Sequence, residues 1–214
     1  MCGRYDLSDS PAAIRAKFSV PAVPDFLANW DLRPTDSAPV VRLATHGPAR
    51  GERECALLRW GLVPSWAKDL RFGSRCINAR AETVATTPAF RDAFRTRRCL
   101  VPVSAFYEWT GPVGRKTRWR IALDAAAGEA SPFALAGLWA WWRDPAQPDA
   151  AGIETYTIVT TAANAQMAPI HDRMPVVLPQ DRYAAWLDPA QDAQAVLGAA
   201  PPALSIVEFS APPR

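Results

Sequence analysis

The second residue of the chain, Cys2, offers a pair of nucleophiles that no other position in a protein can combine. Removal of Met1, which a small following residue permits, would leave an α-amine and a thiol on neighbouring carbons. An α-amine titrates at about 7.7 to 8.0 and a thiol at about 8.5, so both react at tolerable cost near neutral pH. Such a 1,2-aminothiol condenses with an aldehyde to an imine and then closes to a five-membered thiazolidine. Cys2 is therefore the candidate nucleophile, and the alternative is a frayed terminal residue.

Two further side chains are candidates for moving protons. Glu108 follows a nearly apolar run and stands between two aromatic residues, Tyr107 and Trp109. Burial there would raise the pKa of Glu108 and make it a proton donor near neutral pH, unless it is a strand-end residue that faces water. His171 lies between two β-like runs, and an imidazole is well suited to exchange a proton, although a single histidine is often structural.

Two short segments carry polar and aromatic residues that a buried core would not require. Asn78 and Arg80 lie two residues apart, hence on one face if the segment is extended. Trp60 to Trp66 is a turn-bearing loop that ends on an aromatic residue.

The charge is distributed unevenly along the chain. Residues 66–120 carry 12 basic and 4 acidic side chains, whereas residues 121–214 carry 4 and 10. The basic stretch is interleaved with Trp66, Phe72, Trp109 and Trp119. Cations among aromatic residues suit single-stranded nucleic acid, which exposes both phosphates and bases, and the alternative is a solvated face above core aromatics.

Length and composition predict a globular protein that works in a reducing compartment. The 214 residues, 49% of them hydrophobic, are enough for a substantial core, and we expect a single domain over residues 1–214. No apolar run approaches the roughly 20 residues of a membrane span, and no secretory signal begins the chain, so we expect a monomeric cytoplasmic protein. The four cysteines lack any CxxC spacing, which argues against zinc, and we expect Cys55, Cys76 and Cys99 to be buried thiols.

Local patterns predict many short elements in an α+β fold. We expect a helix from about Pro11 through Phe18, capped by Ser10 or Asp9, an exposed loop over Asp144 to Gly152, and an irregular tail after Ala200. Further helices are expected at Pro88–Arg95 and Gln180–Leu187. Strands are expected at Pro39–Ala44, Cys55–Trp60, Cys99–Trp109, Trp119–Leu123, Phe133–Trp142, Thr155–Thr161 and Pro175–Leu178.

Five segments together resemble the SOS-response-associated peptidase family over nearly the whole chain. They are Cys2-Gly3-Arg4-Tyr5, the Trp60–Trp66 loop, Asn78–Thr83, Val101–Trp109 and His171–Pro175, in that order. The resemblance implies a β-rich α+β domain with a barrel-like central sheet and peripheral short helices. It also implies a protein that shields abasic sites in single-stranded DNA through a thiazolidine link, needing no metal and no cofactor.

The resemblance assigns roles to particular residues. Carried over by motif, it implies Cys2 as the nucleophile, Asn78 as the residue that orients the terminal amine, Glu108 as the proton shuttle and His171 as the promoter of sugar-ring opening. For DNA contact it suggests Arg4, Pro34, Trp66, Arg80 and Thr160. Asp31 departs from the family, which usually has Asn there, and its carboxylate would repel a nearby phosphate.

Other functions remain open at this stage. An imine that forms before ring closure permits β-elimination, which would be a lyase side activity. An N-terminal-nucleophile glutamine amidotransferase also begins Met-Cys-Gly, and Arg42 to Gly47 resembles a segment of such enzymes, but no Asn-Gly pair is present for their oxyanion hole. A noncatalytic single-stranded DNA-binding module and a peptidase, limited to residues ahead of Cys2, are further alternatives.

Overall fold

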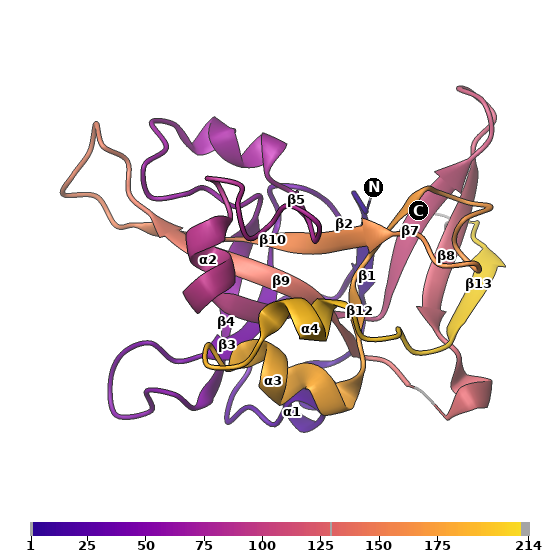
Figure 1. The fold of residues 1–214 in the computed structure, drawn as a ribbon, viewed down its shortest axis with the longest axis horizontal. Helices are drawn as coiled ribbons and strands as arrows, with labels where there is room; N and C mark the ends of the chain where they lie inside the picture. The colour runs from indigo at the N-terminus through magenta and orange to yellow at the C-terminus, as the bar shows by residue number, and fades with distance from the viewer. Residues whose placement is uncertain (1, 129, 211–214) are drawn as a thin grey trace.

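The computed structural model describes residues 2–128 and 130–210, and most of its regular structure is β-strand (Figure 1). The larger of two sheets contains β3 (Ser37–Leu43), β4 (Arg53–Trp60), β5 (Asn78–Arg80), β6 (Arg98–Val103), β9 (Phe133–Trp142), β10 (Ile153–Ala162), β11 (Arg173–Pro175) and β12 (Val177–Leu178). Within it, β10 pairs with β4, β4 with β3, β3 with β6, β6 with β9, and β9 again with β10. These five strands therefore close into a barrel.

The central strands of the barrel show little alternation between buried and exposed residues. Eight consecutive residues of β9, from Phe133 to Ala140, are buried, because the strand faces the barrel interior on one side and packed segments on the other. Most of the predicted strands appear with slightly shifted ends, but the strand predicted at Pro175–Leu178 is divided between β11 and β12. Residues 144–152 form the expected loop between β9 and β10. The α+β fold with a barrel-like sheet is confirmed.

A second sheet of five strands lies beside the barrel, on the right in Figure 1. Its order is β13-β8-β7-β1-β2, with β1 (Tyr5–Leu7), β2 (Asn29–Leu32), β7 (Ala105–Thr110), β8 (Thr117–Leu123) and β13 (Leu204–Glu208). The expectation of an irregular tail after Ala200 is wrong, since β13 pairs antiparallel with β8 in this region.

A sharp corner at Ser104 joins the two sheets. The sequence predicts one strand over Cys99–Trp109, but the chain leaves the barrel after β6 and enters the second sheet as β7. The Ser104 hydroxyl accepts hydrogen bonds from the backbone N–H groups of Ser8 and Asp9 at 2.9 and 3.1 Å, which fixes the corner against the N-terminal strand. Glu108 is thereby carried next to the N-terminal segment.

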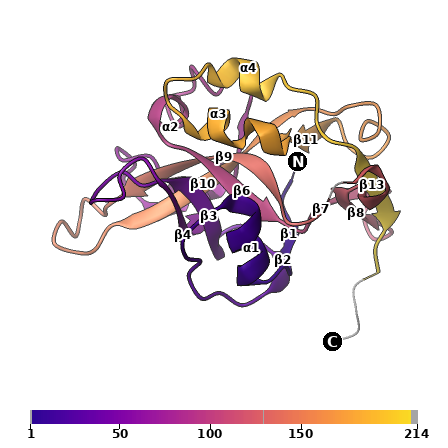
Figure 2. The same cartoon turned by 90° about the horizontal axis from the view of Figure 1, so that it is seen from below.

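Short helices and 3-10 turns flank the two sheets. They are α1 (Pro11–Phe18), α2 (Arg91–Thr96), α3 (Tyr183–Leu187) and α4 (Ala193–Leu197), with 3-10 turns η1 (Leu70–Arg75), η2 (Ala125–Ala127) and η3 (Gln180–Arg182). Figure 2 shows α3 and α4 on one side of the barrel and α1 on the other. Ser10 caps α1 as predicted, because its hydroxyl accepts from the N–H of Ala13. Among the described residues, no helix is both long and apolar enough to cross a membrane.

The loop that carries Trp66 is closed by two glycines packed backbone to backbone. A Cβ on Gly73 would lie 2.4 Å from the carbonyl oxygen of Gly61, and Gly61 itself has a φ of +116°. Within the loop, the carbonyl of Ala67 accepts from the indole of Trp142 at 2.7 Å. The loop is therefore held at its base and at its middle, which fixes the position of Trp66.

Candidate functional site

The N-terminal segment lies in the interior of the protein. Cys2 is fully buried, and its thiol lies 3.9 Å from the carbonyl oxygen of Arg4, to which it donates a weak hydrogen bond. The amide of Asn78, on β5, donates to the carbonyl oxygen of Cys2 at 2.8 Å. The other side-chain atom of Asn78, Oδ1, is buried without a hydrogen-bond partner among the described residues. Asn78 Oδ1 can therefore still accept a hydrogen bond, while the amide nitrogen of the same side chain holds Cys2. Met1 lies outside the described residues.

Burial controls the protonation of the two central groups. Desolvation raises the pKa of the Cys2 thiol far above its usual value, and the charge of Glu108 raises it further. Glu108 is 3% exposed, and burial raises its pKa too, while the charge of His171 opposes that rise. The electrostatic influence of each group on the next places Cys2, Glu108 and His171 close together. In the resting protein the thiol is therefore protonated, and Glu108 holds its proton to a higher pH than an exposed carboxyl.

His171 is oriented by contacts to its Nδ1 atom. This nitrogen lies 2.7 Å from a carboxylate oxygen of Asp172 and 2.9 Å from the backbone nitrogen of Arg173. These contacts fix the orientation of the imidazole ring, which is a group able to exchange a proton with a ligand. Arg173 in turn makes a two-pronged ion pair with Glu82, at 2.7 and 2.9 Å, which ties the histidine loop to the end of β5.

Two buried tyrosines, which the sequence patterns did not single out, lie near Cys2. The hydroxyls of Tyr5 and Tyr156 are 2.6 Å apart, and the ring of Tyr5 packs on Trp60 with centroids 5.2 Å apart. Burial raises the pKa of both phenols well above the usual value, so both remain neutral. Because Tyr5 lies on β1 and Tyr156 on β10, this contact joins the second sheet to the barrel. No sequence signal could have paired them, because 151 residues separate them.

The five residues suggested for DNA contact differ in accessibility. Arg80 is exposed, and Trp66 is 53% exposed, with its ring edge-to-face on Phe72 at 5.1 Å. Arg4 and Pro34 are half-buried, whereas Thr160 is fully buried, and its hydroxyl lies 3.4 Å from the Arg173 guanidinium. The exposed side chains are available for a ligand, and a contact through the side chain of Thr160 would require its cover to move.

A hollow of about 590 Å³ lies next to Trp66. Its walls combine aromatic rings with several cations, and its lining includes Trp66, Lys68, Asp69, Arg71, Phe72 and Arg75. It therefore has the chemical character of a site for bases and phosphates.

Asp31 lies among arginines instead of facing an open phosphate path. Its carboxylate accepts from Arg4 at 2.8 and 2.9 Å, from Arg33 at 2.7 and 3.1 Å, and from Arg118 at 3.2 Å. The sequence indicated that this carboxylate would repel phosphate, but it did not reveal these partners. Arg118 is also stacked on Tyr107, with its guanidinium carbon 3.7 Å from the ring centroid.

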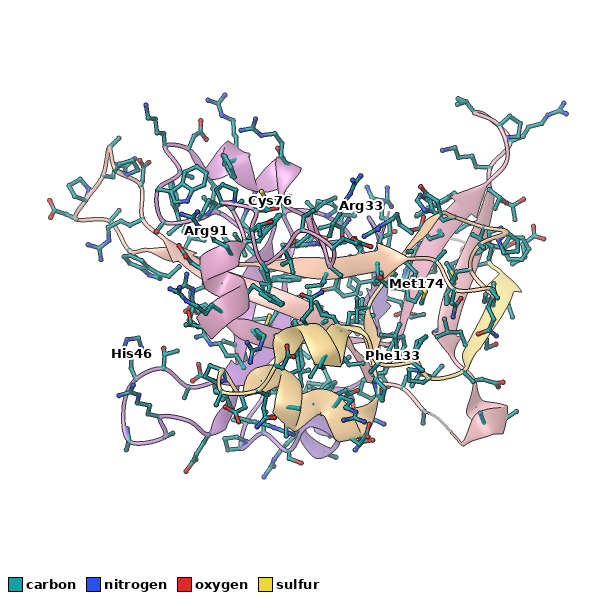
Figure 3. All side chains as sticks on the ribbon, viewed as in Figure 1. Arg33, His46, Cys76, Arg91, Phe133 and Met174 are labelled. Carbon is teal, nitrogen blue, oxygen red and sulfur yellow. The ribbon has the colours of Figure 1, made fainter. Side chains whose placement is uncertain are left out.

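The segment that resembles glutamine amidotransferases lies away from Cys2. Arg42 is buried in ion pairs with Glu54 and Glu154, both at 2.7 Å. His46 follows in an exposed loop, which Figure 3 places at the lower left, away from the N-terminus marked in Figure 1. This segment is thus part of the scaffold and does not contribute to a site around Cys2.

The cysteines and acidic side chains give little support for a metal. Cys76 and Cys99 are buried as expected, Cys55 is half-buried, and all four cysteines are free thiols. In the part of the chain that the structure describes, no group of three or more His, Cys, Asp or Glu side chains is arranged to hold a metal ion.

Comparison with known proteins identifies the family. The family model described as SOS response associated peptidase (SRAP) matches residues 1–210. The abasic site processing proteins YoqW and YoaM of Bacillus subtilis are 36% and 37% identical, each over 88% of this chain and over 81% and 80% of their own lengths. The abasic site processing protein HMCES of Xenopus tropicalis is 28% identical over 77% of this chain and 56% of its own.

Solved structures agree on the fold. A protein from Bacteroides thetaiotaomicron has a TM-score of 0.83 at 22% identity, covering 98% of this chain and 92% of its own. A protein from Bordetella bronchiseptica has a TM-score of 0.81 at 25% identity, covering 98% and 100%. With its barrel, its buried N-terminal cysteine and its match over residues 1–210, the chain belongs to the SOS-response-associated peptidase family.

Proposed function

We propose that this protein captures abasic sites in single-stranded DNA by a covalent thiazolidine link through Cys2, after removal of Met1. The observation that carries the proposal is the convergence of Cys2, Asn78, Glu108 and His171, from four separate parts of the sequence, around one buried N-terminal segment. The printed names of the relatives, abasic site processing proteins, support the choice of substrate.

The protonated state of the thiol argues that the amine reacts first. His171 donates a proton to the ring oxygen of the abasic sugar while the anomeric hydroxyl loses its proton to solvent, which opens the hemiacetal to its aldehyde. The amine nitrogen of Cys2 then attacks the aldehyde carbon, and Asn78 holds that amine through its carboxamide. Glu108 gives its proton to the departing hydroxyl, so one water leaves and an iminium forms.

Ring closure follows from the charge of the iminium. A cation next to the thiol lowers the cost of thiolate formation, which burial otherwise makes high. The sulfur adds to the iminium carbon as the thiol gives its proton to the Glu108 carboxylate, and the ring nitrogen ends as a neutral amine. Before closure, the iminium makes the neighbouring C2′ proton acidic, so a slow β-elimination is part of the proposal as a lyase side activity.

Binding of the strand is assigned to the exposed cations and Trp66. Arg80 neutralises phosphate, and the indole of Trp66 stacks on a base beside the basic hollow. We further propose a monomer that acts in the cytoplasm, where its four thiols remain reduced. Peptidase activity is proposed only for release of the residues ahead of Cys2, because that release uncovers the amine.

Intact mass spectrometry of the purified protein, with and without an abasic single-stranded oligonucleotide, tests the proposal. The mature chain is expected to begin at Cys2 and to gain the mass of the oligonucleotide less one water, in an adduct that survives denaturation. Cys2→Ala should abolish the stable adduct, while Cys2→Ser should form no lasting ring, because a hydroxyl is a far weaker nucleophile than a thiol.

Two results of this experiment would contradict the proposal. A mature wild-type chain without a mass shift, or a Cys2→Ala chain with the same stable shift, would exclude capture through Cys2. Release of ammonia from glutamine by the wild type would favour the amidotransferase alternative instead.

A further inference from the structure

A single carboxylate, that of Asp31, is shared by three guanidinium groups beside the site. Arg4 donates to both of its oxygens through Nη1, Arg33 donates through Nε and Nη2, and Arg118 donates through Nη2. The Asp31 side chain is 14% exposed, so water screens these ion pairs only in part. The group, which we name the arginine cluster (Arg4, Arg33 and Arg118 around Asp31), keeps a net charge of about +2.

The arginine cluster has a fixed side and an open side. Arg118 is 15% exposed and is held by its stacking on Tyr107. The side chains of Arg4 and Arg33 are 33% and 54% exposed, and among the described residues no partner is recorded for Nη2 of Arg4 or Nη1 of Arg33. These two N–H groups are therefore available to an anion that approaches from solvent.

The open side of the cluster flanks the nucleophile. Arg4 is two residues from Cys2, and the carbonyl of Arg4 receives the thiol contact of that cysteine. Figure 3 shows Arg33 on the side of the molecule where Figure 1 marks the N-terminus. A DNA strand that delivers a sugar to Cys2 would pass within reach of this arginine pair.

We propose that Asp31 weakens the noncovalent hold of the protein on DNA phosphate by occupying the arginines that would otherwise bind it. The inference rests on the proposed function, since it assumes that DNA reaches Cys2 past the cluster. A phosphate that contacts Arg4 or Arg33 also approaches the Asp31 carboxylate, and like charges at such a contact repel. The consequence is faster release of strands that hold no reactive sugar.

Asp31 stays ionised over the range in which the protein would work. Burial acts to raise the pKa of its carboxyl, but hydrogen bonds from Arg33 and Arg4 prevail and hold that pKa below the usual value. The repulsion is therefore present at neutral pH.

Binding of an intact, fluorescein-labelled single-stranded oligonucleotide, measured at several salt concentrations, tests the proposal. Asp31→Asn keeps the size of the side chain and removes the charge. At low salt it should bind roughly three- to thirtyfold tighter than wild type, because one repulsive charge is lost and three arginines gain freedom. If the freed arginines neutralise one more phosphate, the log–log salt slope of Asp31→Asn should be steeper than that of wild type by about 0.7.

Two controls separate charge from shape and position. Asp36→Asn changes the net charge equally in the same loop, but Asp36 accepts from the backbone N–H of Arg33 and from none of the cluster's guanidinium groups, so affinity should stay near wild type. Asp31→Glu keeps the charge and should also bind like wild type. Thermal unfolding checks each variant, and Asp31→Ser supplies the same loss of charge if Asp31→Asn does not fold.

The results distinguish this proposal from the proposed function. Wild type that binds the oligonucleotide, with Asp31→Asn binding equally or more weakly, overturns the role of Asp31 and leaves the proposed function intact. Weaker binding would mean that Asp31 positions the arginines for phosphate. Wild type without measurable binding at low salt overturns both.

Discussion

The backbone contact between Gly61 and Gly73 makes the Trp66 loop sensitive to a single methyl group. In Gly73→Ala the new Cβ would lie 2.4 Å from the carbonyl oxygen of Gly61, about 1 Å short of the 3.4 Å at which ordinary contact begins. The obstacle is backbone, which cannot rotate away as a side-chain end can. The Cβ would also meet a methyl of Val63 at 3.1 Å, so the loop base must open.

Overpacking of this kind costs about 1–3 kcal/mol. In a protein of this length each kcal/mol lowers the melting temperature by roughly 2–4 °C, so Gly73→Ala should melt roughly 2–12 °C below wild type. Differential scanning calorimetry or fluorimetry measures this shift. Gly198→Ala is the matched control, because its Cβ would lie 3.6 Å from the nearest atom at an ordinary helical backbone conformation. It should leave stability unchanged or raise it by about 0.4–1 kcal/mol.

The same variant links the loop to DNA binding. Base stacking on an aromatic residue is worth about 1–3 kcal/mol, or roughly a 5- to 150-fold change in affinity. Gly73→Ala should weaken binding of single-stranded DNA by up to the amount lost in Trp66→Ala. A wild-type melting temperature would refute the inferred rigidity of the glycine contact. A lowered melting temperature with unchanged DNA affinity would show that the loop position does not matter for binding.

Further predictions concern proton transfer and charge. Glu108→Gln should slow adduct formation in single-turnover crosslinking by about 10² to 10⁴. The wild-type rate should fall as the pH rises through the raised pKa of Glu108, because the acid form is lost there, and an unchanged rate or profile in the variant would remove Glu108 from the reaction. The same raised pKa means that wild type loses stability as the pH rises from the ordinary carboxyl value of 4.5 through the folded-state value, whereas urea unfolding of Glu108→Gln should show no such loss. His171→Ala should slow capture of the cyclic abasic sugar far more than capture of an open-chain aldehyde, and equal slowing would exclude a role in ring opening. Arg80→Ala should flatten the log–log salt slope of DNA binding by about 0.7, while Trp66→Ala should weaken binding and leave that slope near wild type; equal slopes in Arg80→Ala and wild type would argue against a phosphate contact.

Local signals in the sequence were sufficient for elements whose ends are determined by neighbouring residues. The helix from Pro11 to Phe18 follows from Ser10 as a cap and Pro11 at the first helical position, both of which act within four residues. The aminothiol chemistry proposed for Cys2 likewise depends only on its own position in the chain, and it stays a prediction. The predicted barrel-like fold, inferred by resemblance, is confirmed in the pairing of β10 with both β4 and β9.

Features that depend on distant partners could not be predicted. The strand Leu204–Glu208 is stabilised by pairing with a strand that lies about eighty residues earlier, and its own composition gave no strong signal. The corner at Ser104 interrupts a continuous apolar run, because hydroxyl contacts with the N-terminal segment, almost a hundred residues away, redirect the chain. The sequence shows that Asp31 is charged. It does not show that three arginines share its carboxylate, because folding brings those arginines to Asp31 from separate segments.

The complete burial of Cys2 limits which reagents can reach its thiol. Oxidants and small electrophiles react with exposed thiolates, and a thiol that is enclosed and protonated offers them neither access nor charge. A cell contains many soluble aldehydes and peroxides that could exhaust an exposed aminothiol before it met damaged DNA. In the proposed reaction, enclosure reserves the sulfur for an aldehyde that has already formed a bond to the neighbouring nitrogen, so the thiol is still available when damaged DNA is captured.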